Sequence, residues 1–164
     1  MSNCKSFKPS IDNNSKILIL GSMPGVKSLE EQQYYAHPQN RFWKVLGSIC
    51  NELQLYELDY DVKLKTLLKN NIALWDTIKT CKRDGSLDSD IQNETPNDIR
   101  KLLKTYPNIK TICLNGNKSY TEFKKYFPYL LEKYNCFKMP STSPANARYS
   151  LDILIKEWSD LMLK

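Results

Sequence analysis

The sequence has little of what marks a secreted protein or a membrane protein. No uninterrupted apolar run approaches the roughly 20 residues that a membrane-spanning helix requires. The first 16 residues are polar, so the hydrophobic segment of a signal peptide is missing as well. These absences predict a soluble protein in the cytoplasm, with no membrane as its partner.

Cysteine is too sparse and too scattered for a disulfide framework, a zinc site or an iron–sulfur cluster. The five cysteines are odd in number and widely spaced, and none belongs to a C-x-x-C pair. We therefore expect reduced thiols.

The composition that remains suits one domain. Of the 164 residues, 41% are hydrophobic, which is enough for one core, and no repeat or low-complexity tract is visible. We expect a single domain over residues 1–164. Lys and Arg number 24 against 18 Asp and Glu, and the net charge of +6 suits a polyanionic partner without requiring one.

Four short apolar runs are typical of buried strands: residues 16–20, 72–75, 109–114 and 136–139. Segments with helical spacing lie between them. Strands that alternate with helices pair in parallel through crossover connections. We therefore predict an α/β three-layer sandwich, in which a central sheet of about four parallel strands is flanked by helices.

Apolar residues recur at helical spacing in residues 42–49, 64–68 and 151–162, each as one core-facing stripe. A further helix is predicted to begin at Thr95 and Pro96, because a threonine hydroxyl caps free amides and proline fits the first turn. Pro107 is expected to end that helix near Tyr106.

The segments that leave the four predicted strands are expected to form one site. In a parallel sheet the ligand crevice lies beyond the carboxyl ends of the strands. Residues 21–25, 76–77, 115–116 and 141–147 should therefore meet at one edge.

The first of these segments, GSMPG, does not fit a nucleotide-binding phosphate loop. Val26 displaces the lysine from the second glycine, the glycines are one residue too close, and Pro24 removes a backbone amide. The segment offers instead a tight turn at which a ligand can approach the main chain.

The segment YYAHPQNRFW gathers aromatic, amide, imidazole and cationic groups within ten positions. These groups hold nucleic-acid bases by stacking and hydrogen bonding. Phe42 and Trp43 also fit a role in the core, and Arg41 fits a solvated charge in the first turn of a helix.

Five segments together resemble the uracil-DNA glycosylase superfamily, and most closely its hypoxanthine-DNA glycosylase branch: GSMPG, SLEEQQYYAHPQNRFW, ALWDTIKTCKRDGSLDSDI, LNG and STSPANA. They follow the order of the family over about residues 16–150. The resemblance implies a monofunctional, monomeric repair enzyme that uses neither a metal nor a cofactor. Its partner is DNA containing a deaminated base, above all hypoxanthine. Such an enzyme flips the base out and hydrolyses its N-glycosidic bond, leaving an abasic site. A uracil- or mismatch-type glycosylase of the same fold and a non-catalytic nucleic-acid-binding module are the alternatives.

The resemblance also implies a catalytic residue. Several relatives hold the attacking water with an acidic or amide residue in the first loop, where this chain has Met23, whose thioether cannot do so. The hypoxanthine branch assigns catalysis to the asparagine of its HP-x-N segment, which is Asn40 here. Asn40 also suits a capping role for a helix that begins at Arg41.

The base-binding residues that we predict from this resemblance are Ser22, Met23, Tyr35, Asp76 and Asn115. Tyr35 falls where the family stacks an aromatic ring on the flipped base. Asp76 stands where uracil-specific relatives carry an asparagine, and a carboxylate there accepts the N1–H of hypoxanthine and repels the bare N1 of adenine. His37 fits a general acid or a structural hydrogen bond, and Asp88 and Asp90 fit the branch signature or a solvated turn.

The segment STSPANA matches the second superfamily motif, a loop that grips DNA. Ser141 replaces the histidine or asparagine of relatives, which weakens charge-assisted stabilisation of the leaving base. Arg148 or Tyr149 is expected to fill the gap left by the flipped nucleotide, although serines in a proline loop also suit an ordinary turn. The predicted DNA-binding residues are Ser141, Ser143, Asn146 and Arg148.

Overall fold

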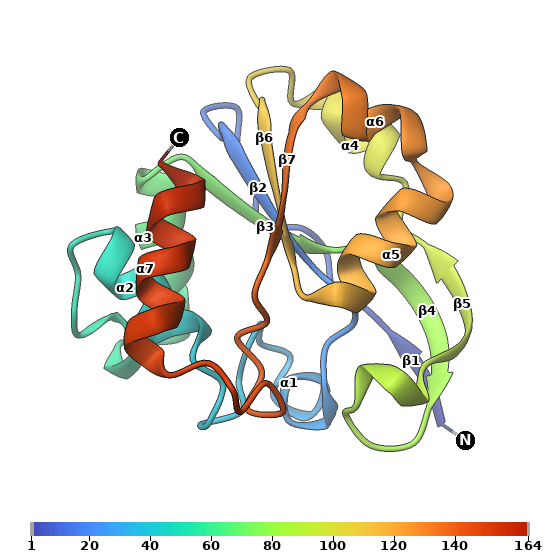
Figure 1. The fold of residues 1–164 in the computed structure, drawn as a ribbon, viewed down its shortest axis with the longest axis horizontal. Coiled ribbons are helices and arrows are strands. Elements are labelled where there is room, and N and C mark those ends of the chain that lie inside the picture. The colour runs from blue at the N-terminus through green and yellow to red at the C-terminus, as the bar shows by residue number, and fades with distance from the viewer. Residues whose placement is uncertain (1, 164) are drawn as a thin grey trace.

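A computed structural model describes residues 2–163 and has a four-stranded parallel sheet at its centre (Figure 1). Its strands are β2 (Ile17–Gly21), β3 (Ile72–Asp76), β6 (Thr111–Asn115) and β7 (Asn135–Met139), in the spatial order β3-β2-β6-β7. All three neighbouring pairs are parallel. The four strands predicted from the apolar runs, and their parallel pairing, are confirmed.

Both faces of this sheet are buried, which explains why its strands read as continuous apolar runs. On β2, the side chains of Leu18 and Leu20 pack into one hydrophobic cluster, whereas Ile19 packs into another on the opposite face. All three residues are fully buried.

Helices cover each face, so the predicted three-layer sandwich is confirmed (Figure 1). One layer consists of α2 (Phe42–Ile49), α3 (Tyr60–Lys69) and α7 (Leu151–Met162), and the other of α4 (Ile99–Thr105), α5 (Asn117–Tyr126) and α6 (Pro128–Lys133).

A second sheet, absent from the sequence-based predictions, lies beside the first. It is antiparallel, with the order β1-β4-β5, and comprises β1 (Ser2–Lys5), β4 (Ile78–Arg83) and β5 (Gln92–Pro96). Three of its apolar side chains are buried, those of Cys4, Ile78 and Cys81, and they form a small cluster with Met23 and Ile91. β3 ends at Asp76 and β4 begins at Ile78, so the second sheet starts beside the carboxyl end of β3, where the pocket described below lies.

Short helices complete the fold. They are α1 (Val26–Glu31) after the GSMPG segment and two 3-10 turns, η1 (Leu55–Glu57) and η2 (Asp88–Asp90). Within residues 2–163, no helix combines the length and the apolar character that a membrane crossing needs.

The helix predicted to start at Thr95 starts later. Thr95 lies in β5, where its hydroxyl forms a hydrogen bond of 2.5 Å with the hydroxyl of Thr80 on β4. The helix begins at Ile99, capped by Asp98, whose carboxylate accepts a hydrogen bond from the backbone N–H of Lys101 at 3.1 Å. The expectation was wrong because a β-ladder partner outcompeted the local capping signal.

Candidate active site

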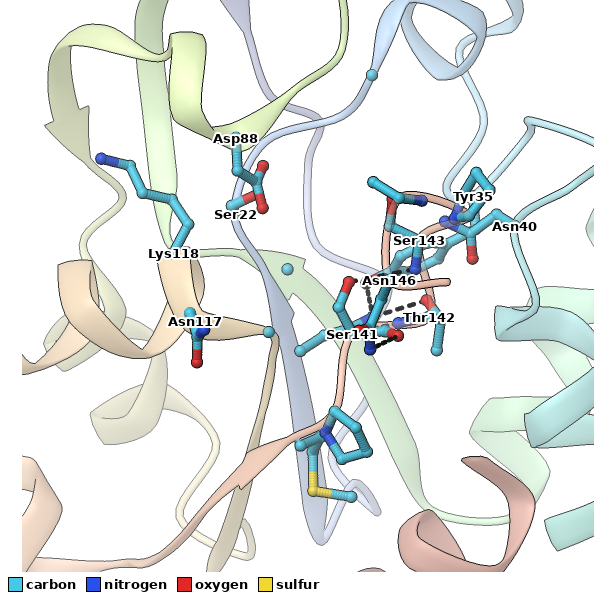
Figure 2. A pocket seen from close by; sticks show the side chains of 18 of the residues that line it. Ser22, Tyr35, Asn40, Asp88, Asn117, Lys118, Ser141, Thr142, Ser143 and Asn146 are labelled. Atoms are coloured by element: carbon cyan, nitrogen blue, oxygen red, sulfur yellow. Dashed lines mark hydrogen bonds between the residues drawn. The ribbon is translucent and has the colours of Figure 1, made fainter. Parts of the chain in front are cut away.

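A cavity of about 1070 Å³ opens at the edge of the parallel sheet where its four strands end. Its lining includes Gly21 from β2, Asp76 from β3, Asn115 from β6 and Ser141, which closely follows β7. The predicted convergence of the four strand-exit segments is confirmed. Figure 2 shows Ser22 and Asp88 together on one side of this pocket, and Tyr35 and Asn40 on the other.

The first wall consists of the GSMPG loop and the loop of residues 84–91 that packs on it. The Ser22 hydroxyl donates to a carboxylate oxygen of Asp88 at 2.7 Å, and the Ser86 hydroxyl accepts from the backbone N–H of Val26 at 2.8 Å. These two bonds tie together distant segments of the chain, since they span 66 and 60 residues. Asp88 therefore holds the pocket wall, a role that a solvated turn does not describe.

Arg83, the last residue of β4, anchors this wall. It is 1% exposed, and its Nη2 donates to the Pro24 carbonyl at 2.6 Å, while Nη1 lies 3.9 Å from the Asp88 carboxylate. A buried guanidinium is stable only where such acceptors surround it. Arg83 is not among the residues predicted from the sequence, because a charged residue at the end of a lysine-containing segment is typical of a solvated surface.

Gly21 and Asp76 are neighbours across the β2–β3 pair and touch closely. A Cβ at position 21 would lie 2.5 Å from the Asp76 Oδ1 and 3.0 Å from the Tyr35 hydroxyl. Only glycine therefore lets the carboxyl group and the phenol occupy this place together.

Asp76 is 4% exposed, and its Oδ2 has no hydrogen-bond partner among the residues that the structure describes. The pKa of this carboxyl is raised to about 7, chiefly by burial and also by the negative charge of Asp88, while the charge of Arg83 partly offsets the rise. An acid with these properties titrates near neutral pH.

Tyr35 presents an aromatic surface at the pocket. Its ring stacks on Phe42, with centroids 3.8 Å apart and an interplanar angle of 16°, and its hydroxyl accepts a hydrogen bond from the Asn115 amide at 3.3 Å. Its backbone adopts a φ of 55°, a left-handed conformation that is costly for a bulky residue. Phe42 is fully buried and packs into the core together with Trp43, so the core role expected for these two residues is confirmed.

Asn40 lies beside Tyr35 in the pocket (Figure 2). Its Oδ1 accepts a hydrogen bond from the backbone N–H of Phe42 at 2.9 Å, so the amide caps the first N–H of α2, although Arg41 and not Asn40 occupies the N-cap position of this helix. The cap fixes the orientation of the side chain, and an amide oxygen keeps a second lone pair for another donor.

Arg41 holds the second wall, formed by residues 141–149. Its guanidinium donates to three main-chain carbonyls of this segment, those of Ser143, Asn146 and Tyr149. The interpretation of Arg41 as a solvated first-turn charge was wrong. Its position beside a loop that is distant in sequence surrounds it with acceptors that no local pattern reveals.

Asn115 ties β6 to the same wall. Its Nδ2 donates to the hydroxyl of buried Thr142 at 3.1 Å as well as to Tyr35, and its Oδ1 accepts from the Thr142 N–H at 3.1 Å. Both amide protons are thus engaged within the protein.

The family of the chain follows from a comparison with known proteins. The model of the uracil DNA glycosylase superfamily matches residues 9–161. The chain belongs to this superfamily. Two relatives that bear the name hypoxanthine DNA glycosylase are similar to it. The protein of Methanosarcina acetivorans is 42% identical over 147 residues, covering 89% of this chain and 90% of that protein, and the protein of Methanosarcina barkeri is 45% identical over 115 residues, covering 70% and 72%.

A solved member of the superfamily has the same fold. The solution NMR structure of a candidate uracil DNA glycosylase from Methanosarcina acetivorans superimposes with a TM-score of 0.81 at 38% sequence identity, covering 98% of this chain and 99% of that one. The two proteins therefore share one overall fold.

Two further residues singled out in the sequence, Met23 and His37, differ in their surroundings. Met23 lines the pocket, but it is 6% exposed and packs with Ile78 and Cys81 in the cluster under the second sheet. His37 is exposed, and its Nδ1 accepts from the Gln39 N–H at 3.1 Å, as a structural hydrogen bond would.

The serines and amide of the second motif shape their own loop. The Ser141 hydroxyl accepts from the Ser143 N–H at 3.2 Å, the Ser143 hydroxyl accepts from the Ala145 N–H at 3.1 Å, and the Asn146 amide donates to the Ser141 carbonyl at 3.0 Å. Arg148 is exposed at the rim of the pocket. In this superfamily member the loop is thus both an ordinary turn and a rim of the pocket.

Proposed function

We propose that this chain is a monofunctional DNA glycosylase of base excision repair that flips hypoxanthine out of DNA and hydrolyses its N-glycosidic bond. One observation carries the proposal: Asn40, Tyr35 and Asp76 line one pocket at the strand ends. The similarity to relatives named hypoxanthine DNA glycosylase supports it. The enzyme works as a monomer in the cytoplasm and uses no metal or cofactor.

Asn40 positions the attacking water. Cleavage develops positive charge on the sugar and negative charge on the departing base, so the water needs correct placement more than deprotonation. The bond from Phe42 holds the Asn40 side chain in one orientation, and the second lone pair of Oδ1 accepts a hydrogen bond from the water.

Tyr35 and Asp76 bind the flipped base. The ring of Tyr35 is backed by Phe42, which makes it a rigid platform for stacking, an interaction worth about 1 to 3 kcal/mol per base. Asp76 meets the hydrogen-bonding edge of the base, and Ser22 completes this side of the pocket. Asn115 acts by holding Tyr35 and Thr142 in place.

DNA lies across the rim formed by Ser141, Ser143, Asn146 and Arg148. Arg148 is exposed and reaches a phosphate or fills the gap in the duplex. With a net charge of +6, the protein attracts the DNA backbone, and binding weakens steeply as salt rises.

A strand-breakage assay tests the function. Duplexes that contain inosine, uracil, xanthine or a thymine mismatch are incubated with the protein and treated with alkali, which breaks the strand at abasic sites. We expect the fastest cleavage at inosine. Preferred cleavage at uracil would instead identify a uracil-type enzyme, and binding without any cleavage would identify a binding module.

Asn40→Ala tests the catalytic assignment. We expect single-turnover cleavage to fall at least 100-fold, since the water loses its positioning group. Ser150→Ala is the matched control, because the Ser150 hydroxyl also caps a helix, accepting from the Ile153 N–H at 3.2 Å. Both changes should cost about 1 kcal/mol of stability, and only Asn40→Ala should slow cleavage. Equal rates in the two variants would refute a catalytic Asn40.

A further inference from the structure

Asp76 is an acid without a counter-ion. It is 4% exposed, its Oδ2 accepts no hydrogen bond from the described residues, and no ion pair of Asp76 is found among residues 2–163. Transfer of a carboxylate to such a place is costly, whereas the neutral acid is far easier to bury.

The groups around Asp76 strengthen this preference. The negative charge of Asp88, on the adjoining loop, disfavours the ionised form of Asp76, and Arg83 at the end of β4 only partly offsets it. The remaining titratable groups that interact with Asp76 are phenols, whose pKa values are raised by burial so that they stay neutral: Tyr34, Tyr35 and Tyr60.

We infer that Asp76 binds the flipped base as a neutral carboxylic acid that pairs with the lactam edge shared by deaminated bases. This inference rests on the proposed function and specifies its substrate class. The acid O–H donates to the carbonyl oxygen of the base, and the acid C=O accepts from the neighbouring ring N–H. Hypoxanthine, uracil and xanthine all present this pair of groups.

The neutral acid offers the same donor and acceptor as an asparagine amide. A carboxylate offers acceptors only and leaves the carbonyl oxygen of the base unpaired against a negative charge. The two protonation states therefore predict opposite pH dependences: the neutral acid reads the base best below pH 7, and the carboxylate reads it best above.

The pH profile of single-turnover cleavage tests the inference, using an inosine duplex and a uracil duplex between pH 5.5 and 9. For the wild type we expect a decline of roughly tenfold per pH unit above the pKa of Asp76. Asp76→Asn, which carries the neutral donor–acceptor pair at every pH, should lack this decline. Asp90→Asn, which removes a charge from an exposed residue of the same region, should keep it.

A stability measurement separates this inference from the function. If Asp76 stays protonated in the fold, the wild type should lose stability relative to Asp76→Asn as pH rises from about 4 to about 7, and no further above that. Urea denaturation at several pH values measures the difference.

The outcomes are distinct. Cleavage that rises with pH, or the same decline in Asp76→Asn as in the wild type, overturns the inference and leaves the glycosylase function intact. If no base is cleaved, the proposed function falls, and the stability profile alone decides whether Asp76 is a neutral acid: parallel profiles for the wild type and Asp76→Asn overturn it.

Discussion

The two walls of the pocket are held in the same way but differ in charge. Arg83 holds the GSMPG wall in place, and Arg41 holds the wall of residues 141–149. In both cases the guanidinium donates hydrogen bonds to main-chain carbonyls. Arg83 has an acidic neighbour, since Asp88 lies 3.9 Å away, and its charge also lowers the pKa of Asp76. The hydrogen bonds of Arg41 go to uncharged carbonyls alone.

This difference divides the work of the pocket. Asp76, which lies beside the Arg83 wall, has a pKa raised to about 7, so base recognition on this side of the pocket depends on pH. The Arg41 wall has a shape fixed by permanently charged and neutral groups. Acidity should therefore change base recognition and leave the DNA-gripping loop in place.

The largest effect that we predict comes from Arg41→Met. Three partly buried carbonyls lose their donor, and each such loss costs about 1 kcal/mol or more, so the free energy of unfolding should fall by about 3 kcal/mol. Cleavage should be lost as well, because the 141–149 loop no longer holds its shape. Urea denaturation and the alkali assay measure the two effects.

Arg41→Lys keeps the charge and removes the fork of donors. A lysine ammonium cannot reach carbonyls on several sides at once, so we expect it to recover less than half of the lost stability. Full recovery by lysine would show that charge, and not the geometry of the guanidinium, holds this wall.

The next effect comes from Gly21→Ala on the opposite wall. The new Cβ would sit 2.5 Å from the Asp76 Oδ1, so Asp76 must move, at a cost of about 1 to 3 kcal/mol. Cleavage should fall more than tenfold, because the acid leaves its place at the base. The added alanine methyl in Gly25→Ala would lie 3.1 Å from the Oγ and 3.3 Å from the Cβ of Ser86, a milder overlap, so this variant should be tolerated better. Comparable losses of cleavage and stability in both variants would show that the conformation of the loop, rather than the contact with Asp76, requires glycine at position 21.

The parallel sheet and the pocket at its strand ends could be predicted because a strand buried on both faces has a recognisable sequence. Each of the four strands is a continuous apolar run, and parallel pairing sends every exit loop to one edge. The antiparallel sheet could not be predicted in this way. Its strands expose most of their side chains, so residues such as those of β5 show neither alternation nor an apolar run.

The site residues whose contacts are local in sequence could be predicted, whereas those whose contacts join distant segments could not. The capping bond of Asn40 spans two residues, and the sequence pattern includes it. The bonds of Arg41 span more than 100 residues, and the contact of Arg83 with Pro24 spans 59, so no local pattern distinguishes these buried anchors from solvated charges. Asn115 was expected to bind the base, but its amide protons are directed to Tyr35 and Thr142.

The smallest effect that we predict sharpens the electrostatic contrast between the walls. Asp88→Asn retains an oxygen that accepts the Ser22 hydroxyl and removes a negative charge that raises the pKa of Asp76. The pKa of Asp76 should therefore fall, and the pH at which cleavage declines should move down by about half a unit to one unit.

Two comparisons show whether this shift has an electrostatic origin. Asp90→Asn removes the same charge from an exposed residue of the same 3-10 turn, and solvent screens its influence on Asp76. It should leave the midpoint of the profile unchanged. The shift in Asp88→Asn should also persist in the pH dependence of unfolding, where the loss of stability between pH 4 and pH 7 becomes smaller. A change in cleavage rate with no shift of either midpoint would mean that Asp88 serves the wall only as a hydrogen-bond acceptor, and the contrast between a titrating wall and a neutral one would rest on Asp76 alone.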